Sequence, residues 1–163
     1  MRIIALDLAS TTGFAVGATT GPADDSGSLD FRLGKGAGKC TGKSFYDFYE
    51  WLDDLIQAQL IIFQEPITLV YERPLCNFYN TVRVAHGFAT VVQVLEGKYQ
   101  DKGVVCTNVP PTSIKKFWTG TGRADKELML ATAREQYPQC GGHDQADALA
   151  ILHFWQEVYD EKI

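Results

Sequence analysis

Several features that mark other protein classes are missing from this 163-residue chain. No apolar stretch approaches the roughly 18 residues that cross a bilayer, so no membrane-spanning helix is expected. The first residues lack the basic, apolar and small-residue order of a secretory signal, which leads us to expect a cytoplasmic protein with no membrane partner. Internal repeats, low-complexity tracts and linkers are also absent, so the length predicts a single domain over residues 1–163.

Closely spaced cysteines are missing as well. The chain has four cysteines, and no two of them have C-x-x-C spacing, which argues against a zinc site. Free, mostly buried thiols in a reducing compartment are the simplest interpretation of such scattered residues. They are Cys40, Cys76, Cys106 and Cys140.

Positive charge is scarce overall, since the net charge is −5. That balance argues weakly against a nucleic-acid partner, because phosphate binding needs a basic surface. Two windows depart from the average: residues 32–43 contain no acid, and residues 115–126 contain one. Together they hold eight of the fifteen basic residues, namely Arg32, Lys35, Lys39, Lys43, Lys115, Lys116, Arg123 and Lys126.

The apolar pattern predicts an α/β protein with the element order β-β-β-α-β-α-β-α-α. Hairpin-like connections come first and helical crossovers follow, which indicates a mixed five-stranded sheet, three antiparallel strands and then two parallel, with helices on both faces. The proline pair at 110–111 stops a strand and opens a short helix through Trp118. The predicted strands are 2–8, 13–19, 28–35, 67–72 and 103–109, and the longer helices are 45–63, 80–100, 125–137 and 144–160.

Four carboxylates stand at informative places in this pattern. Asp7 and Glu72 each end an apolar strand, and the ends of adjacent parallel strands meet at the sheet edge where α/β proteins bind ligands. Asp144 and Asp147 are three residues apart at the start of a helix, so they share one face. Blander interpretations remain open: Asp7 as a solvated turn residue, and Asp144 as a helix cap with Asp147 as its capping-box partner.

Four converging carboxylates would repel one another, and a divalent cation would remove that repulsion. Oxygen-only ligands suit Mg²⁺ or Mn²⁺ rather than zinc. Two such ions about 4 Å apart can activate a water and stabilise the leaving oxygen of a phosphodiester. The carboxylates therefore predict a metal-dependent phosphodiester chemistry.

The same segments resemble those of the RuvC-type Holliday junction resolvases, a family of the ribonuclease H-like superfamily. That family opens with an apolar strand ending in Asp, a small-residue turn and Thr-Gly, as in "DLASTTG" at 7–13. Its second acid ends a central strand, as in "VYERP" at 70–74, and its third and fourth form D-x-x-D-A-L-A, as at 144–150. Its DNA-contacting segment resembles "PPTSIKKFWTGTGRADK" at 110–126, so the similarity covers nearly the whole chain in order.

The resemblance implies a ribonuclease H-like nuclease domain that acts as a homodimer on four-way or other branched DNA. It implies paired symmetric cuts that depend on two Mg²⁺ ions per active site, with Mn²⁺ as a substitute. Carried over by position, the catalytic metal ligands are Asp7, Glu72, Asp144 and Asp147. The DNA-contacting residues are Lys115, Lys116, Arg123 and Lys126, together with Lys39, Lys43 and Arg73.

Other positions are less clearly assigned. His143, next to Asp144, has two interpretations. It is a structural or solvated residue, or it supports the metal ligands and carries protons. The family's usual Pro-Gly after the first Asp is replaced by Leu8-Ala9, where a positive φ would be harder to adopt. The aromatic that wedges into bases at the crossover has three candidate replacements, Leu75, Phe78 and Tyr79. An acidic, compact member would suit a phage or prophage enzyme acting without a branch-migration motor.

Three further functions compete with junction resolution. One is a related nuclease acting on other branched DNA or RNA, and another is a junction-binding module that does not cleave. The third is a phosphotransferase or ATPase on a related fold, which would need a second, duplicated domain. The segment "AGKCTGKS" at 37–44 fits a permissive phosphate-loop pattern, but a mobile basic loop near DNA explains it better, so no nucleotide ligand is expected.

Overall fold

The computed structural model describes residues 1–33, 40–75 and 79–160. Five strands form one mixed sheet in the order β3-β2-β1-β4-β5. Antiparallel pairs join β1 (Arg2–Asp7) to β2 (Thr11–Ala18) and β2 to β3 (Asp25–Asp30). Parallel pairs join β1 to β4 (Ile67–Glu72) and β4 to β5 (Val104–Val109). The predicted fold class is therefore confirmed.

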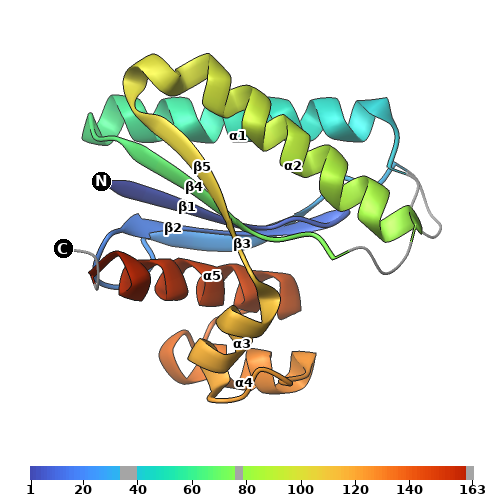
Figure 1. The fold of residues 1–163 in the computed structure, drawn as a ribbon, viewed down its shortest axis with the longest axis vertical. Coiled ribbons are helices and arrows are strands. Elements are labelled where there is room, and N and C mark those ends of the chain that lie inside the picture. The colour runs from blue at the N-terminus through green and yellow to red at the C-terminus, as the bar shows by residue number, and fades with distance from the viewer. Residues whose placement is uncertain (34–39, 76–78, 161–163) are drawn as a thin grey trace.

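Helices cover both faces of the sheet (Figure 1). The long helices α1 (Gly42–Phe63) and α2 (Tyr79–Tyr99) lie on one face, and the 3₁₀ turn η1 (Gln100–Lys102) leads from α2 into β5. The other face carries α5 (His143–Asp160), with α3 (Pro111–Thr119) and α4 (Lys126–Gln136) packed on it. Within the described chain, no helix has the length and apolar character to cross a membrane.

The central strand β1 contributes to a separate core on each face. Ile4 and Leu6 pack toward α1 and α2, whereas Ile3 and Ala5 pack toward α5. Successive side chains of a strand point to opposite faces, so a strand covered on both sides needs a continuous apolar run. The run "IIAL" before Asp7 therefore follows from the position of β1 in the middle of the sheet.

The third strand begins earlier than the sequence predicts. We expected it at 28–35, but β3 spans Asp25–Asp30, and residues 34–35 lie outside the described chain. Its first residues, Asp25 to Gly27, have the composition of a turn. Because β3 is an edge strand in which no side chain is fully buried, its backbone bonds to β2 hold it without apolar alternation.

The first helix begins in the phosphate-loop-like segment. Thr41 is the N-cap of α1, and its N–H donates to the Ser44 hydroxyl at 3.1 Å in a capping box. Ser44 is fully buried. The hydroxyls that would contact a phosphate or its metal in a nucleotide-binding loop are thus used to start a helix, while residues 37–39 of the segment lie outside the described chain.

Candidate active site

Two of the predicted carboxylates meet at one edge of the sheet. The parallel register of β1 and β4 pairs Leu6 with Tyr71, so Asp7 and Glu72 follow side by side at the carboxyl ends of these strands. Both side chains are partly buried. This is the edge at which open α/β sheets place their ligands.

The other two carboxylates arrive on the first turn of α5. The helix begins at His143, so Asp144 lies inside the first turn rather than at the cap position. The helix dipole favours a negative charge in this first turn. Gln145 fastens this turn to the sheet, since its Nε2 donates to the Ser26 hydroxyl at 2.9 Å. Asp144 and Asp147 are both partly buried and both face the sheet edge that carries Asp7.

These four side chains line one pocket of about 350 Å³. Its walls come from the β1–β2 turn, the residues after β4, and helices α2, α3, α4 and α5, so segments far apart in sequence build it. The basic residues among its walls are Arg73, Lys115 and Lys126. The apolar residues are Leu8, Ala9, Pro74, Leu75, Ala85 and Met129.

The pocket makes ionisation unfavourable for three of its acids. Burial, followed by the charges of Asp147, Glu72 and Asp144, raises the pKa of Asp7 well above its usual range. Burial and the charge of Asp147 raise the pKa of Glu72 to about 7. Burial also raises the pKa of Asp147, with Asp144 adding to the effect. Without a cation, this site does not readily hold four negative charges.

Two lysines partly offset the repulsion. Lys115 on α3 and Lys126 at the start of α4 both act against the pKa increases at Glu72 and Asp147, and Lys126 also acts on Asp7. Lys126 is exposed and Lys115 is half-buried, and both line the pocket. The pocket therefore combines carboxylates with ammonium groups, so its residues could hold hard cations through the acids and attract a phosphate through the lysines.

The donor set fits hard divalent cations, because it offers carboxylate oxygens and no thiol or imidazole among the lining residues given above. The carboxylates are not gathered into a preformed ligand cluster: within 1–33, 40–75 and 79–160, no three His, Cys, Asp or Glu side chains are close enough to hold one ion. Ion binding would thus require side-chain rotations within the pocket, and it would relieve the mutual repulsion that raises the pKa of Asp7.

The other predicted DNA-contacting residues lie around this pocket or outside it. Lys116 on α3 and Arg123 between α3 and α4 are exposed and do not line it. Arg73 is at the rim, where its Nε donates to Asn108 Oδ1 at 2.8 Å. Lys43, on the first turn of α1, forms an ion pair with Asp47. Lys39 lies outside the described residues.

His143 makes its described contacts with α4. Its Nδ1 lies 3.1 Å from the Lys126 carbonyl oxygen, and its Nε2 lies 3.4 Å from a Glu127 carboxylate oxygen. The imidazole thereby joins the starts of α4 and α5, the two turns that carry Lys126 and Asp144. These contacts favour the structural interpretation of His143.

The turn after Asp7 closes without the family's usual Pro-Gly. Thr12 is fully buried, and its hydroxyl donates to the Ala9 carbonyl at 2.8 Å. Among described non-glycine residues, Gln64 alone has a positive φ, so the Leu8-Ala9 replacement meets no backbone strain. Of the candidate wedge residues, Leu75 lines the pocket with 55% of its surface exposed, Phe78 lies outside the described chain, and Tyr79 begins α2.

Sequence reasoning missed two apolar lining residues, Ala85 of α2 and Met129 of α4. Both have low exposure and both belong to helices with an apolar stripe. The stripe could mark them only as core residues, because nothing in a periodic pattern tells which core residue borders a cavity.

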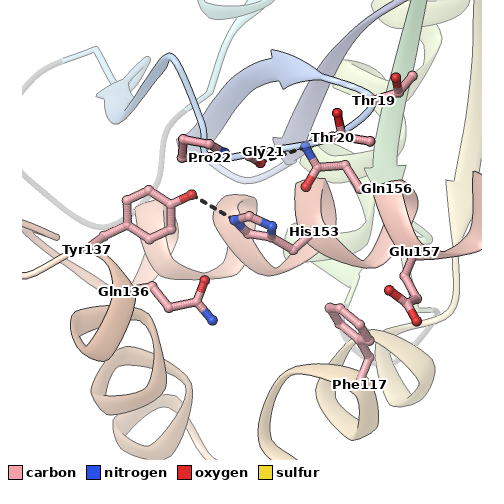
Figure 2. A pocket seen from close by; sticks show the side chains of 10 residues that line it. All are labelled: Thr19, Thr20, Gly21, Pro22, Phe117, Gln136, Tyr137, His153, Gln156 and Glu157. Atoms are coloured by element: carbon pink, nitrogen blue, oxygen red, sulfur yellow. Dashed lines mark hydrogen bonds between the residues drawn. The ribbon is translucent and has the colours of Figure 1, made fainter. Parts of the chain in front are cut away.

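A larger cavity, of about 490 Å³, lies at the opposite end of β1, beside the turn that follows β2 (Figure 2). Among its lining residues in the described structure none is a lysine or arginine, so it does not suit a phosphate backbone. The Tyr137 hydroxyl accepts from the Ala23 N–H and forms a hydrogen bond with Nε2 of His153, 2.7 Å away. Burial lowers the pKa of His153, which disfavours the charged form of this imidazole. These contacts tie α4 to α5 and to the β2–β3 connection.

Solved structures share this fold over nearly the whole chain. Thermus thermophilus RuvC matches with a TM-score of 0.66 and 17% identity, over 99% of this chain and 96% of that one. The same protein in complex with a Holliday junction substrate matches with a TM-score of 0.64, 17% identity and the same coverage. The yeast mitochondrial Holliday junction resolvase Ydc2 matches with a TM-score of 0.59 and 13% identity, over 94% of this chain and 77% of that one.

No protein-family model matches the chain, and no curated protein matches it significantly in sequence. The likeness that the sequence motifs predict is therefore confirmed at the level of the fold: this is the ribonuclease H-like fold that RuvC-type resolvases share.

Proposed function

We propose that this chain, which has the fold of the RuvC-type resolvases, is a metal-dependent endonuclease that resolves four-way DNA junctions. One observation carries the proposal: a single pocket combines four carboxylates from β1, β4 and α5 with two lysines from α3 and α4. The fold likeness supplies the substrate class, since one of the similar structures is a complex with a Holliday junction substrate.

In this proposal the four carboxylates hold two Mg²⁺ ions. Such ions, when bound, activate a water molecule and stabilise the leaving oxygen of a phosphodiester. Cation binding would favour the ionised form of the carboxylates whose pKa is raised in the free protein. Lys115 and Lys126 attract the scissile phosphate to the pocket and offset its negative charge.

DNA binding outside the pocket depends on local cationic surface, because the net charge of −5 provides no general attraction. Lys116 on α3 and Arg123 in the loop that follows this helix are both exposed. In this proposal they contact phosphates of the duplex that lie outside the carboxylate pocket. Phosphate contacts of this kind determine where the duplex lies without reading its sequence.

Paired cuts need two active sites held at a fixed separation, and one copy of this chain supplies one carboxylate pocket in its described part. We therefore propose that the working form is a homodimer. Sedimentation of the free protein and of its junction complex tests this part, and a monomer in both states would contradict it.

The experiment that tests the function is incubation with end-labelled four-way junctions, flaps, linear duplex and RNA–DNA hybrids, each with Mg²⁺, with Mn²⁺ or with EDTA. Junction resolution predicts symmetric nicks in the four-way substrate that ligase can seal, and none in EDTA. Preferential cutting of flaps or hybrids would instead indicate a related nuclease. Tight junction binding without cutting under every metal condition would indicate a binding module.

A further inference from the structure

Gly13 lies at the closest approach between the sheet and α5. It pairs with Asp7 in the β1–β2 register, so it is the immediate neighbour of the first carboxylate. A Cβ atom built on Gly13 would lie 1.8 Å from the backbone carbonyl oxygen of Asp144 and 2.4 Å from its carbonyl carbon. Backbone therefore meets backbone at this point, and position 13 of β2 has no room for a side chain.

The requirement for glycine here is one of space. Among the described residues, the glycines with positive φ are Gly21, Gly103 and Gly120, so Gly13 has a conformation that any residue can adopt. What excludes a larger residue is the atom it would meet, which is backbone of Asp144 rather than the end of a flexible side chain.

We propose that Gly13 is a positioning residue for the carboxylate pocket. By letting the backbone of Asp144 rest on β2, it sets how closely the first turn of α5 approaches Asp7. This inference rests on the proposed function, and it concerns the spacing of the cation-binding carboxylates rather than the stability of the fold.

The packing of α5 concentrates any displacement at its first turn. A Cβ on Gly13 would have to move from 1.8 Å to at least 3.0 Å from the Asp144 oxygen, a shift of roughly 1.2 Å. Further along the helix, the run from Ala148 to Leu152 is fully buried between the sheet and the helices α3 and α4, and it resists movement. The first turn is held instead by side chains that are only partly buried: Gln145 donates to the hydroxyl and the carbonyl of Ser26, and His143 contacts the Lys126 carbonyl. These hydrogen bonds yield more easily than the buried run. The first turn would therefore tilt away from Asp7.

The chain offers a matched control in Gly17. It lies four residues along the same strand and also packs on α5, but a Cβ there would meet the Leu152 Cδ2 atom at 3.3 Å, a side-chain contact that needs a shift of only a few tenths of an ångström. Gly17→Ala adds the same methyl group to the same strand without touching the backbone that carries the carboxylates.

The experiment compares Gly13→Ala and Gly17→Ala with the native chain. Cleavage at saturating junction, junction affinity, Mn²⁺ affinity by calorimetry and the thermal unfolding transition are measured. For Gly13→Ala we expect junction affinity within about twofold of native, cleavage reduced about 100-fold and Mn²⁺ affinity reduced at least about tenfold. Gly17→Ala should keep native cleavage and Mn²⁺ affinity.

A rescue variant separates positioning from general damage. Asp144→Glu lengthens the carboxylate by one carbon–carbon bond, about 1.5 Å, which matches the expected displacement. Combined with Gly13→Ala it should restore cleavage at least about tenfold over Gly13→Ala alone. In the native background Asp144→Glu should lower cleavage, because the longer side chain then places its carboxylate beyond the position that holds the cation.

Several results would overturn the proposal: equal behaviour of the two alanine variants, loss of the cooperative unfolding transition in Gly13→Ala, or no gain from Asp144→Glu. If the native chain binds Mn²⁺ but cuts no branched DNA, the proposed function fails while the Mn²⁺ affinities of the two variants still decide the role of Gly13. A native chain that neither cuts nor binds Mn²⁺ overturns both.

Discussion

Glu72 provides a test of the carboxylate pocket that needs no DNA. Burial and the charge of Asp147 raise its pKa from 4.5 to about 7. An acid whose pKa is raised by folding binds a proton more tightly in the folded chain than in the unfolded chain. Its contribution to stability is therefore complete below about pH 4.5 and is lost as the pH rises through 7.

The size of this effect follows from the pKa change. A rise from 4.5 to about 7 corresponds to on the order of 2–3 kcal/mol once solvent screening at this partly exposed site is included. Glu72→Gln replaces the carboxyl by a neutral group of the same shape. In EDTA at pH 8 we expect the variant to be more stable than the native chain by about that amount, and at pH 4 we expect the two to be nearly equal.

Urea unfolding at pH 4, 6 and 8 in EDTA measures the difference directly. Glu135→Gln, at an exposed position on α4, is the matched control and should show no such pH-dependent gain. Adding Mn²⁺ at pH 8 should reverse the order, because cation binding stabilises the native chain and Glu72→Gln has lost one ligand. Calorimetry in two buffers should also detect protons released by the native chain as Mn²⁺ binds.

A constant stability difference between Glu72→Gln and the native chain from pH 4 to pH 8 would refute the reasoning. It would mean that Glu72 is ionised in the folded protein without penalty, so that the pocket does not crowd its negative charges. An equal stabilisation of both proteins by Mn²⁺ would refute the assignment of Glu72 as a ligand.

Three other substitutions have defined outcomes. Asp7→Asn should remove cleavage in a gel assay. It should change junction affinity, measured by fluorescence anisotropy, less than about threefold, because affinity comes from phosphate contacts. Retained cleavage would exclude Asp7 as a metal ligand. Arg123→Ala should reduce the slope of the logarithm of the junction-binding constant against the logarithm of salt concentration by roughly 1. Lys102 precedes β5 at the other end of the sheet, so Lys102→Ala should leave this slope unchanged. Equal slopes for the two variants would refute a localised DNA-binding surface. Asp53→Asn should lower the melting temperature at pH 7 by about 3–6 °C. Burial raises the pKa of Asp53, but hydrogen bonds from Lys98 and Tyr99 outweigh burial and lower this pKa. The difference in melting temperature between Asp53→Asn and the native chain should therefore shrink as acid protonates the native carboxylate. A difference that is the same at pH 3 would contradict the reasoning.

Local pattern was enough to determine the elements and the sheet class of this protein. The apolar run before Asp7 predicts a strand buried on both faces, and β1 is the middle strand of the sheet. The helical spacing of the residues after Ser44 predicts α1, although its start is shifted to Gly42 by the Thr41 cap. The boundary of β3 was wrong because backbone pairing with β2, which no side-chain pattern records, holds its polar residues in place.

The carboxylates could be identified in the sequence because acids at strand ends and at a helix start are local features. Their meeting in one pocket could be expected only through an assumed strand adjacency, which the parallel pairing of β1 with β4 now supplies. The pocket's apolar walls, the inclusion of Lys115 and Lys126, and the change in pKa at Glu72 depend on distances between elements that have no sequence signature.

The contact between Gly13 and Asp144 shows most clearly what the sequence determines and what only the tertiary structure decides. The sequence contains a glycine after a threonine, which is compatible with a turn, a bulge or a close approach. Only the packing of α5 on β2, fixed by buried residues far along both elements, makes that glycine a point where two backbones touch. Sequence determines which groups are available to a site, and tertiary packing determines their separation, on which their charge states and any shared ion depend.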